Sequence, residues 1–427
     1  MKARSASRIA FGAALLGAVP SCARCNDSVE SKKSEDTRVV ASASSPTPPS
    51  SSHPADDDAN AARVIATSPS IVDAGAVSRA SSCRLVFGPA EQPFRGPAAI
   101  VMTPRELSLV ANDHGKPRIF PVAVTRPPAA SAPRVTVRQP SSFVSMRSTP
   151  CEIAGSYAYC PENDGTVYRT SIGTDDTKAV AKGRPGARIA VASLGDGHAV
   201  VATLDTRRTS EGEVLQAFVT LDDGKTQRLS EEGAGAIAVR MVPRGRGAVA
   251  VYLDARTAMV PVHARPLALE NGELSLGSDA VVFVGGPPEL GIDVTLAATA
   301  RSLHALVPLG RGARDFGMVA IDVRDPPKED SVWSLYPNGL DPAAIGATTN
   351  NADGAWVSRV RPVDASAHSP RVLELGRIDD TGVFTSMGII ADGGHVTDIA
   401  MATDAFGAVW ILYGDSSITW LERRICS

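Results

Sequence analysis

ARIAVASLGDGHAVVAT, at residues 187–203, is the stretch that decides the fold. Two runs of small and β-branched residues flank Gly195-Asp196-Gly197, where glycine supplies the positive φ that a tight hairpin requires. A third apolar run at 215–221 ends at Asp222-Asp-Gly224, and the more polar run 226–229 follows. The stretch therefore predicts four antiparallel strands, of which the first are apolar and the last is polar.

The same unit recurs along the chain. Candidate innermost strands begin 44 to 57 residues apart, and strand-only units of that length are typical of radial sheets around one axis. No stretch of 12 residues after residue 21 shows convincing helical periodicity. The seven candidate innermost strands start near Ala98 (AAIVMT), Ser142 (SFVSMR), Ala187 (ARIAVASL), Ala236 (AIAVRMV), Asp293 (DVTLAA), Ala343 (AAIGATT) and Val396 (VTDIAMA).

The two ends of the repeat region complement each other. Cys83-Arg-Leu-Val-Phe87 precedes the first unit as a strand without a sheet, and the seventh unit lacks a fourth strand. We expect the N-terminal strand to complete the last sheet, because closure protects edges that otherwise template aggregation. From about Cys83 to Cys426 the chain resembles the β-propeller superfamily. The predicted fold class is all-β: a β-propeller of seven four-stranded blades, closed by the N-terminal strand pairing into the last blade.

This resemblance rests on periodicity and not on a blade signature. The glycines Gly285-Gly286 and Gly393-Gly394 lack the spaced aromatics of Kelch blades, and no Gly-His…Trp-Asp pattern of WD40 blades is present. Asp353-Gly-Ala-Trp356 and Asp404…Trp410 resemble turns of bacterial sensor and lyase propellers. Two such turns do not assign a family, so six and eight blades stay open as alternatives.

Four cysteines of the repeat region predict two disulfides. Cys83 and Cys426 lie at its two ends, and Cys151 and Cys160 lie nine residues apart around a candidate hairpin. Of three possible pairings, only Cys83–Cys426 with Cys151–Cys160 matches the ring topology. The first bond would close a loop of some 340 residues, which chain-entropy estimates equate with roughly 4–5 kcal/mol. The alternative is four buried free thiols.

Residues 1–21 are predicted to be an export signal. Three basic residues accompany an apolar stretch from Ile9 to Val19 that is too short to span a bilayer. Val19-Pro20-Ser21-Cys22 resembles the lipobox of bacterial lipoproteins, which implies cleavage before Cys22, lipidation of Cys22 and a membrane anchor. Val19 and Pro20 depart from the usual pattern, and ordinary cleavage after Ala23 is the alternative.

The expected location follows from this leader. Ala23 stands where Asp would favour inner-membrane retention in many Gram-negative bacteria, so we expect an outer membrane or cell surface lipoprotein. A periplasmic or secreted soluble protein is the alternative. Both compartments are oxidising, so both suit disulfides. Cys22-Ala-Arg-Cys25 also matches a zinc or redox spacing, but no second ligand pair follows, and Cys25 is left unassigned.

Residues 22–80 are predicted to form a disordered Pro/Ser/Ala-rich tether. Residues 46–54 are rich in proline and serine, Asp56-Asp57-Asp58 adds charge, and aromatic residues are absent. A flexible segment of this length spans roughly 40 Å. The predicted organisation is therefore a signal peptide at 1–21, the tether at 22–80 and the β-propeller domain at 81–427.

Composition supports an all-β domain and argues against nucleic acid as a partner. Hydrophobic residues make up 43% of the chain and aromatics only 5%, with alanine and valine prominent, which suits packed sheets. The net charge is −3 and no basic stripe is present. Nucleic-acid binding depends on such a stripe, so no nucleic-acid partner is expected.

The sequence contains no recognised catalytic motif, and we predict no catalytic, cofactor-binding or metal-binding residues. The sequence has no Gly-x-Ser-x-Gly, His-Glu-x-x-His, phosphate-binding loop or EF-hand. Asx-Gly corners such as Asn163-Asp164-Gly165 form without calcium. Four tryptophans either line a sugar-binding surface or pack the blades: Trp333, Trp356, Trp410 and Trp420. Four histidines lie at or near predicted turns: His114, His198, His304 and His395. One interpretation is that they share one rim of the ring as a metal or acid–base site. The other is that they are ordinary surface residues.

We therefore predict a non-enzymatic cell-envelope lipoprotein that presents a β-propeller as a binding or scaffold module. Its expected partners are a membrane, through the lipid anchor, and an unidentified protein or polysaccharide, through one rim. The alternative is a propeller-type lyase or hydrolase that acts on glycan or lactone substrates at the central channel. Propeller enzymes draw their catalytic residues from several blades, so the lack of local motifs does not exclude one.

Overall fold

The structure is a computed structural model that describes residues 82–426, with gaps at 103–106, 126–133, 138–143, 146–148, 257–259, 285–293, 309–315, 337–344, 349–353, 364–369 and a few shorter positions. The predicted signal peptide, the tether, Cys22, Cys25, His53 and His368 lie outside the described residues. Among the described residues, no helix has the length and hydrophobicity that a bilayer crossing requires.

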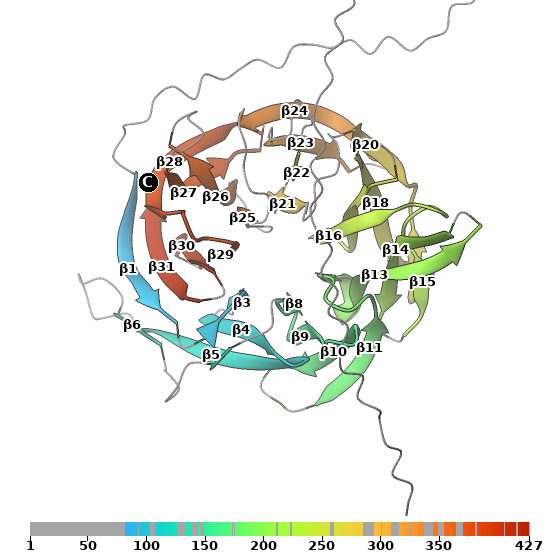
Figure 1. Ribbon diagram of the computed structural model, residues 1–427, viewed down its shortest axis with the longest axis horizontal. Helices are drawn as coiled ribbons and strands as arrows, with labels where there is room; N and C mark the ends of the chain where they lie inside the picture. Colours follow the sequence, from blue (N-terminus) through green and yellow to red (C-terminus); the bar gives the residue numbers. More distant parts are fainter. Residues whose placement is uncertain are drawn as a thin grey trace, which may run out of the picture. The chain divides into compact units, whose positions relative to one another are not determined.

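Seven antiparallel sheets follow one another around a ring, which is the predicted seven-blade β-propeller (Figure 1). We number the blades in chain order. The strands of blades 1 to 3 are β3 (Ala98–Met102), β4 (Leu107–Asp113), β5 (Lys116–Thr125), β6 (Arg134–Val137); β8 (Glu152–Ala154), β9 (Tyr157–Pro161), β10 (Thr166–Ser171), β11 (Thr177–Lys182); β12 (Ala190–Ser193), β13 (Ala199–Thr209), β14 (Gly212–Leu221), β15 (Thr226–Arg228).

The remaining blades repeat this order, with an additional strand, β20, paired to β18 in blade 4. The strands of blades 4 to 6 are β16 (Ala236–Arg244), β17 (Gly247–Asp254), β18 (Pro261–Glu270), β19 (Glu273–Leu276), β20 (Ala280–Val284); β21 (Thr295–Ala298), β22 (Leu303–Pro308), β23 (Phe316–Asp322), β24 (Lys328–Tyr336); β25 (Ile345–Ala347), β26 (Ala355–Pro362), β27 (Arg371–Ile378), β28 (Phe384–Asp392). Blade 7 consists of β29 (Asp398–Thr403), β30 (Val409–Gly414), β31 (Thr419–Cys426) and β1 (Cys83–Glu91).

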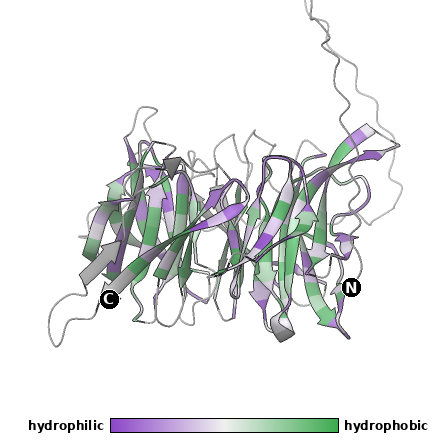
Figure 2. Ribbon diagram, turned by 90° about the horizontal axis from the view of Figure 1, so that it is seen from below, coloured by the Kyte–Doolittle hydropathy of each residue, from purple (hydrophilic) through white to green (hydrophobic). Residues whose placement is uncertain are grey.

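The innermost strands form a closed circle around the axis. Contacts link β3 to β8, β8 to β12, β12 to β16, β16 to β21, β21 to β25, β25 to β29 and β29 back to β3. Neighbouring blades bury small side chains between them, such as the fully buried Ala202, Ala217 and Ala250 of blades 3 and 4. Hydrophobic stretches therefore recur along the strands in Figure 2, because each sheet is covered on both faces.

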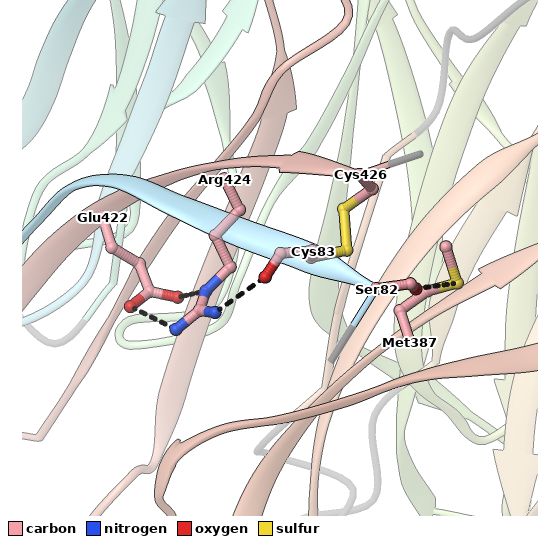
Figure 3. Close-up of a disulfide and its surroundings, with 6 residues drawn as sticks. All are labelled: Ser82, Cys83, Met387, Glu422, Arg424 and Cys426. Carbon is pink, nitrogen blue, oxygen red and sulfur yellow. Dashed lines mark hydrogen bonds and ion pairs between the residues drawn. A yellow bond between two sulfur atoms is a disulfide. The ribbon is translucent and has the colours of Figure 1, made fainter. Parts of the chain in front are cut away.

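The predicted ring closure is confirmed. β1 pairs antiparallel with β31, so that Cys83 lies opposite Cys426 and the first strand completes the last blade. The two cysteines form a disulfide with a Cα–Cα distance of 4.0 Å (Figure 3). Arg424 donates to the carbonyl of Cys83 at 3.5 Å and is paired with Glu422 at 2.7 Å. The closure is thus stabilised by backbone pairing, a covalent bond and the hydrogen bond from Arg424 to Cys83.

The second predicted disulfide is also present. Cys151 and Cys160 bracket the β8–β9 hairpin and both are buried. Gly155 in the turn between these strands has a φ of 59°, a conformation that glycine adopts without strain. Two disulfides are typical of proteins in oxidising, extracytoplasmic compartments.

One predicted innermost strand is wrong. The sequence placed the second unit at Ser142, whereas the innermost strand of blade 2 is β8. The apolar run around 144 forms β7 (Val144–Ser145), which lies between blades 1 and 2. It pairs in parallel with β2 (Phe94–Arg95), which lies between β1 and blade 1. Periodicity alone does not separate two short apolar runs, because each matches the pattern of a strand. The other six predicted strands coincide with β3, β12, β16, β21, β25 and β29.

Gly346 of β25 allows two innermost strands to approach closely. A Cβ at this position would lie 2.6 Å from Cγ2 and 2.9 Å from the carbonyl oxygen of Ile399 in β29. The backbone oxygen belongs to a paired strand and has little room to move. Glycine is therefore required here by packing at the axis.

We expect Gly346→Ala to lower the free energy of unfolding by about 1–3 kcal/mol, because the added methyl overpacks the axis. Gly195→Ala is the matched control, since a Cβ there would meet its nearest atoms, in Arg246, at 3.4 Å. Thermal and denaturant unfolding of both variants measure the difference. Equal stability of the two variants would contradict the close approach of β25 to β29.

Blade 6 contains a buried ion cluster. Arg359 Nη2 lies 2.8 Å and Arg361 Nε 3.2 Å from Oε2 of Glu374, and the Ser386 hydroxyl donates to Oε1 at 2.7 Å. Burial alone would raise the pKa of Glu374, but the two guanidinium groups and Ser386 outweigh it and hold this pKa below its usual value. The carboxylate is therefore ionised wherever the domain is folded near neutral pH.

This cluster predicts acid sensitivity. A depressed pKa contributes stability above the unfolded value of about 4.3, and that stability is lost as the pH falls through the folded value. We expect Glu374→Gln to be about 2 kcal/mol less stable at pH 7 and to lose less further stability below about pH 5. Denaturant titrations between about pH 3 and 7 measure both effects. Glu273→Gln, at an exposed pair with Lys225, should follow the unmodified chain; an unchanged acid slope for Glu374→Gln would contradict the assignment.

Candidate functional site

A cavity of about 420 Å³ lies at the axis of the propeller. Its lining includes the first residues of several innermost strands, and it also includes the end of β30 and the start of β31, which lie at the same end of blade 7. We call this end of the ring the entrance end and the opposite one the far end. Every innermost strand contributes to the lining: Ala98, Glu152, Val191, Met241, Thr295, Gly346 and Asp398 are examples in blade order.

An ion pair crosses the entrance. Arg188 Nη2, two residues before β12 of blade 3, lies 2.7 Å from Asp398 Oδ1 at the start of β29 in blade 7. On a circle of seven blades these two blades are as far apart as any pair, so the interaction spans the axis. The side chains are 39% and 27% exposed. A pair this accessible contributes at most about 1 kcal/mol to stability, so it does little to hold the ring. Both residues line the axial cavity.

Two other charged groups of the cavity, Arg240 and Asp415, hydrogen-bond to residues near them in sequence. Arg240 of β16 donates from Nη1 to the carbonyl of Val239 at 2.8 Å. Asp415 accepts from the hydroxyl and amide of Ser417 and from the amide of Ile418. The hydrogen bond from the Ser417 hydroxyl is the largest cause that holds the pKa of Asp415 below its usual value. A carboxylate of this kind stays ionised at neutral pH and is unsuited to donate a proton as a general acid.

A second cavity, of about 360 Å³, lies between blades 3 and 4 and shares Arg188 and Arg240 with the first. We call it the blade 3–4 groove. Its basic lining is completed by Arg184, which is exposed just after β11. Its apolar lining includes Leu204, Leu215 and Ile237. The groove thus places three guanidinium groups beside aliphatic walls.

The four candidate histidines do not share one rim. His114 follows β4 and His395 precedes β29, which places both at the entrance end. His198 precedes β13 and His304 is the second residue of β22, and these second strands begin at the far end. Successive turns alternate between the two ends of a blade, and the prediction that the histidines share one rim did not take this alternation into account. Among the described residues, no group of three or more His, Cys, Asp or Glu is placed to hold a metal ion.

A buried cluster in blade 4 was not found from the sequence. The Tyr252 hydroxyl hydrogen-bonds to Nδ1 of His263 at 3.0 Å and to the carboxylate of Asp279, and the two rings stack with centroids 4.5 Å apart. Burial, and next the hydrogen bond to Asp279, raise the pKa of Tyr252, so the phenol stays protonated. Tyr252 and His263 are register partners of β17 and β18, so strand pairing is the signal that identifies the cluster.

The tryptophans and Asx-Gly corners have structural roles. Trp356 and Trp410 are buried in β26 and β30, and Trp420 packs partly buried against the blade 6–7 core, which confirms the packing interpretation. The side chain of Trp333 lies outside the described set. Asp164 accepts hydrogen bonds from the amide and hydroxyl of Thr166, which close its turn.

The search of protein-family models found no match, and no curated protein matched either. Solved structures do match in fold. Polysaccharide lyase Uly1 matches at 8% identity and a TM-score of 0.45, over 77% of this chain and 90% of that chain. U3-55K matches at 11% identity and a TM-score of 0.44, over 80% and 98%. YjhT matches at 10% identity and a TM-score of 0.40, over 64% and 92%. These similarities carry no argument about function, and the class that the fold defines is a seven-bladed β-propeller protein.

Proposed function

We propose that this chain is an exported, lipid-anchored and non-enzymatic binding module of the cell envelope, which presents the entrance end of its propeller to a macromolecular partner. The leader and Cys22 support the anchor, because Val19-Pro20-Ser21-Cys22 resembles a lipobox. The two disulfides support an oxidising compartment outside the cytoplasm. The predicted tether would hold the propeller away from the membrane surface.

The observation that carries the binding role is the ion pair between Arg188 and Asp398. It joins two opposite charges across the entrance at 2.7 Å, and both residues line the axial cavity. A glycan lyase or hydrolase that works by general acid–base catalysis would instead place a proton donor and a proton acceptor around the reacting group. The described entrance offers recognition groups, namely guanidinium forks and aliphatic walls, which suit a binding surface.

Site-specific photocrosslinking in intact cells tests this role. A photoreactive residue replaces His395, exposed at the entrance end of blade 7, or Phe406, which is 61% exposed at the far end of the same blade. We expect one recurrent adduct from position 395 and none from position 406. Adducts from neither position would contradict the proposal. Turnover of a glycan or lactone by the purified full chain would replace it with the lyase or hydrolase alternative.

The anchor has its own test. Mass spectrometry of the mature protein should find an N-terminal peptide that begins with a lipid-modified Cys22, and Cys22→Ser should release the protein from the membrane fraction. An unmodified peptide that starts at Arg24 would contradict lipidation and favour the soluble alternative.

A further inference from the structure

The blade 3–4 groove has a strongly one-sided charge. Its described lining includes Arg184, Arg188 and Arg240 and no acidic residue. The axial cavity differs, because Glu152, Asp398 and Asp415 offset its two arginines there. The described lining therefore carries a net positive formal charge in the groove and a net negative one in the axial cavity. A guanidinium is planar and pairs with carboxylates in a fixed fork geometry, so three of them select an anionic ligand.

The side chains that form the walls of the groove indicate which class of anionic ligand fits it. Leu204, Leu215 and Ile237 give it an aliphatic surface, and no aromatic side chain belongs to the described lining. Stacking on aromatic faces is absent from such a site, and its apolar area favours branched aliphatic side chains over sugar rings. A peptide in which acidic and aliphatic residues alternate presents both kinds of group to one groove.

We propose that the blade 3–4 groove binds an acidic, partly aliphatic peptide segment of a partner protein. The inference rests on the proposed binding role and specifies the partner's chemistry. Asp398 has a second part in it, because its carboxylate already holds Arg188 at 2.7 Å. A carboxylate of the incoming peptide competes with Asp398 for that guanidinium. Asp398 therefore acts as an internal competitor that weakens binding and excludes ligands with too few acidic groups.

Fluorescence anisotropy of the full chain tests the proposal with three probes. The first is a fluorescein-labelled peptide of alternating glutamate and leucine, the second its glutamine–leucine counterpart, and the third a labelled oligogalacturonate. We expect the acidic peptide to bind at least about tenfold more tightly than both others, with affinity that falls as salt rises. Equal binding of the glutamine peptide, or preference for the oligogalacturonate, would overturn the proposal.

Three variants locate the binding. Arg184→Glu should weaken binding of the acidic peptide by about tenfold, because a charged hydrogen bond is lost and repulsion is added. Asp398→Asn should strengthen it several-fold, because Arg188 is released. Arg84→Glu makes the same charge change at an exposed position near the start of β1, at the far end of the ring, and should leave the affinity for the peptide unchanged. Binding that is insensitive to Arg184→Glu, or that Asp398→Asn weakens, would contradict the groove as the site.

The experiments distinguish a failure of the peptide assignment from a failure of the proposed binding role. An adduct at position 395 in cells, together with no binding of the acidic peptide, overturns the peptide assignment and leaves the binding module intact. No adduct at position 395 together with tight, Arg184-dependent peptide binding contradicts a cellular partner at the entrance end and leaves the peptide specificity of the groove in place.

Discussion

Replacing Cys83 and Cys426 together with serine is expected to lower the free energy of unfolding by about 4–5 kcal/mol. The bond links residues 343 apart in sequence, so its loss frees nearly the whole propeller in the unfolded state. β1 then remains attached to blade 7 through backbone pairing, the hydrogen bond from Arg424 and the packing of Phe87 against Trp410. Denaturant titration of the double variant under non-reducing conditions measures the effect.

Cys151→Ser with Cys160→Ser is the matched control. That disulfide closes a loop of nine residues, for which the same chain-entropy relation gives about 2–3 kcal/mol. Loss of the ring-closing bond should therefore lower the free energy of unfolding more, although both cysteine pairs are in the core. A larger loss from the short loop would contradict the view that the long one locks the circle.

Asp404→Ala is expected to cost about 3–5 kcal/mol, because it leaves a buried guanidinium without its counter-charge. Asp404 Oδ2 lies 2.7 Å from Nη2 of Arg423, which is 2% exposed, and accepts from Nε1 of Trp410 at 3.0 Å. Its Oδ1 accepts from the amides of Phe406 and Ala408, which shapes the turn between β29 and β30. One carboxylate thus joins a turn, a buried tryptophan and a buried arginine.

Two controls separate these roles. Asp404→Asn keeps an acceptor for the turn but removes the charge, so its loss should be smaller than that of alanine. Asp113→Ala removes an exposed partner of Arg118 at 3.5 Å and should change stability by less than about 1 kcal/mol. Thermal and denaturant unfolding measure all three variants. A loss at Asp404 no larger than that at Asp113 would contradict its role as a buried counter-charge.

Much of the fold was predictable because its signals are local. Small apolar runs and glycine turns recur at a blade-sized period, and six of the seven innermost strands begin within three residues of the predicted start. Closure was predictable for a different reason. The first strand has no sheet and the last unit lacks a strand, so pairing them leaves neither edge exposed. Cys83 and Cys426 at those two ends made the same prediction independently.

The errors arise where local pattern does not fix position in space. The run around Val144 and the strand β8 are both short, and the contacts of β8 with β3 and β12 are what assign it to the axis. The histidines were grouped by their nearness to turns, without following which end each turn faces. His114 and His304 accordingly lie at opposite ends of their blades.

The candidate site was largely unpredictable because its residues are distant in sequence. Arg188 and Asp398 are separated by 210 positions and meet only when the circle closes. Arg184 and Arg240 come from different blades, and neither belongs to a motif. The absence of motifs predicted no catalytic residue, but it carried no information about which end of the ring holds the cavities.

Disulfide mapping of the protein isolated from cells tests the central claim, a ring closed by a disulfide between its two ends. Free thiols are alkylated at lysis, and the peptides are separated without reductant. The structure predicts one linked pair that contains Cys83 and Cys426 and a second that contains Cys151 and Cys160. Alkylated Cys83, or Cys83 linked to Cys151 or Cys160, would contradict the closed ring.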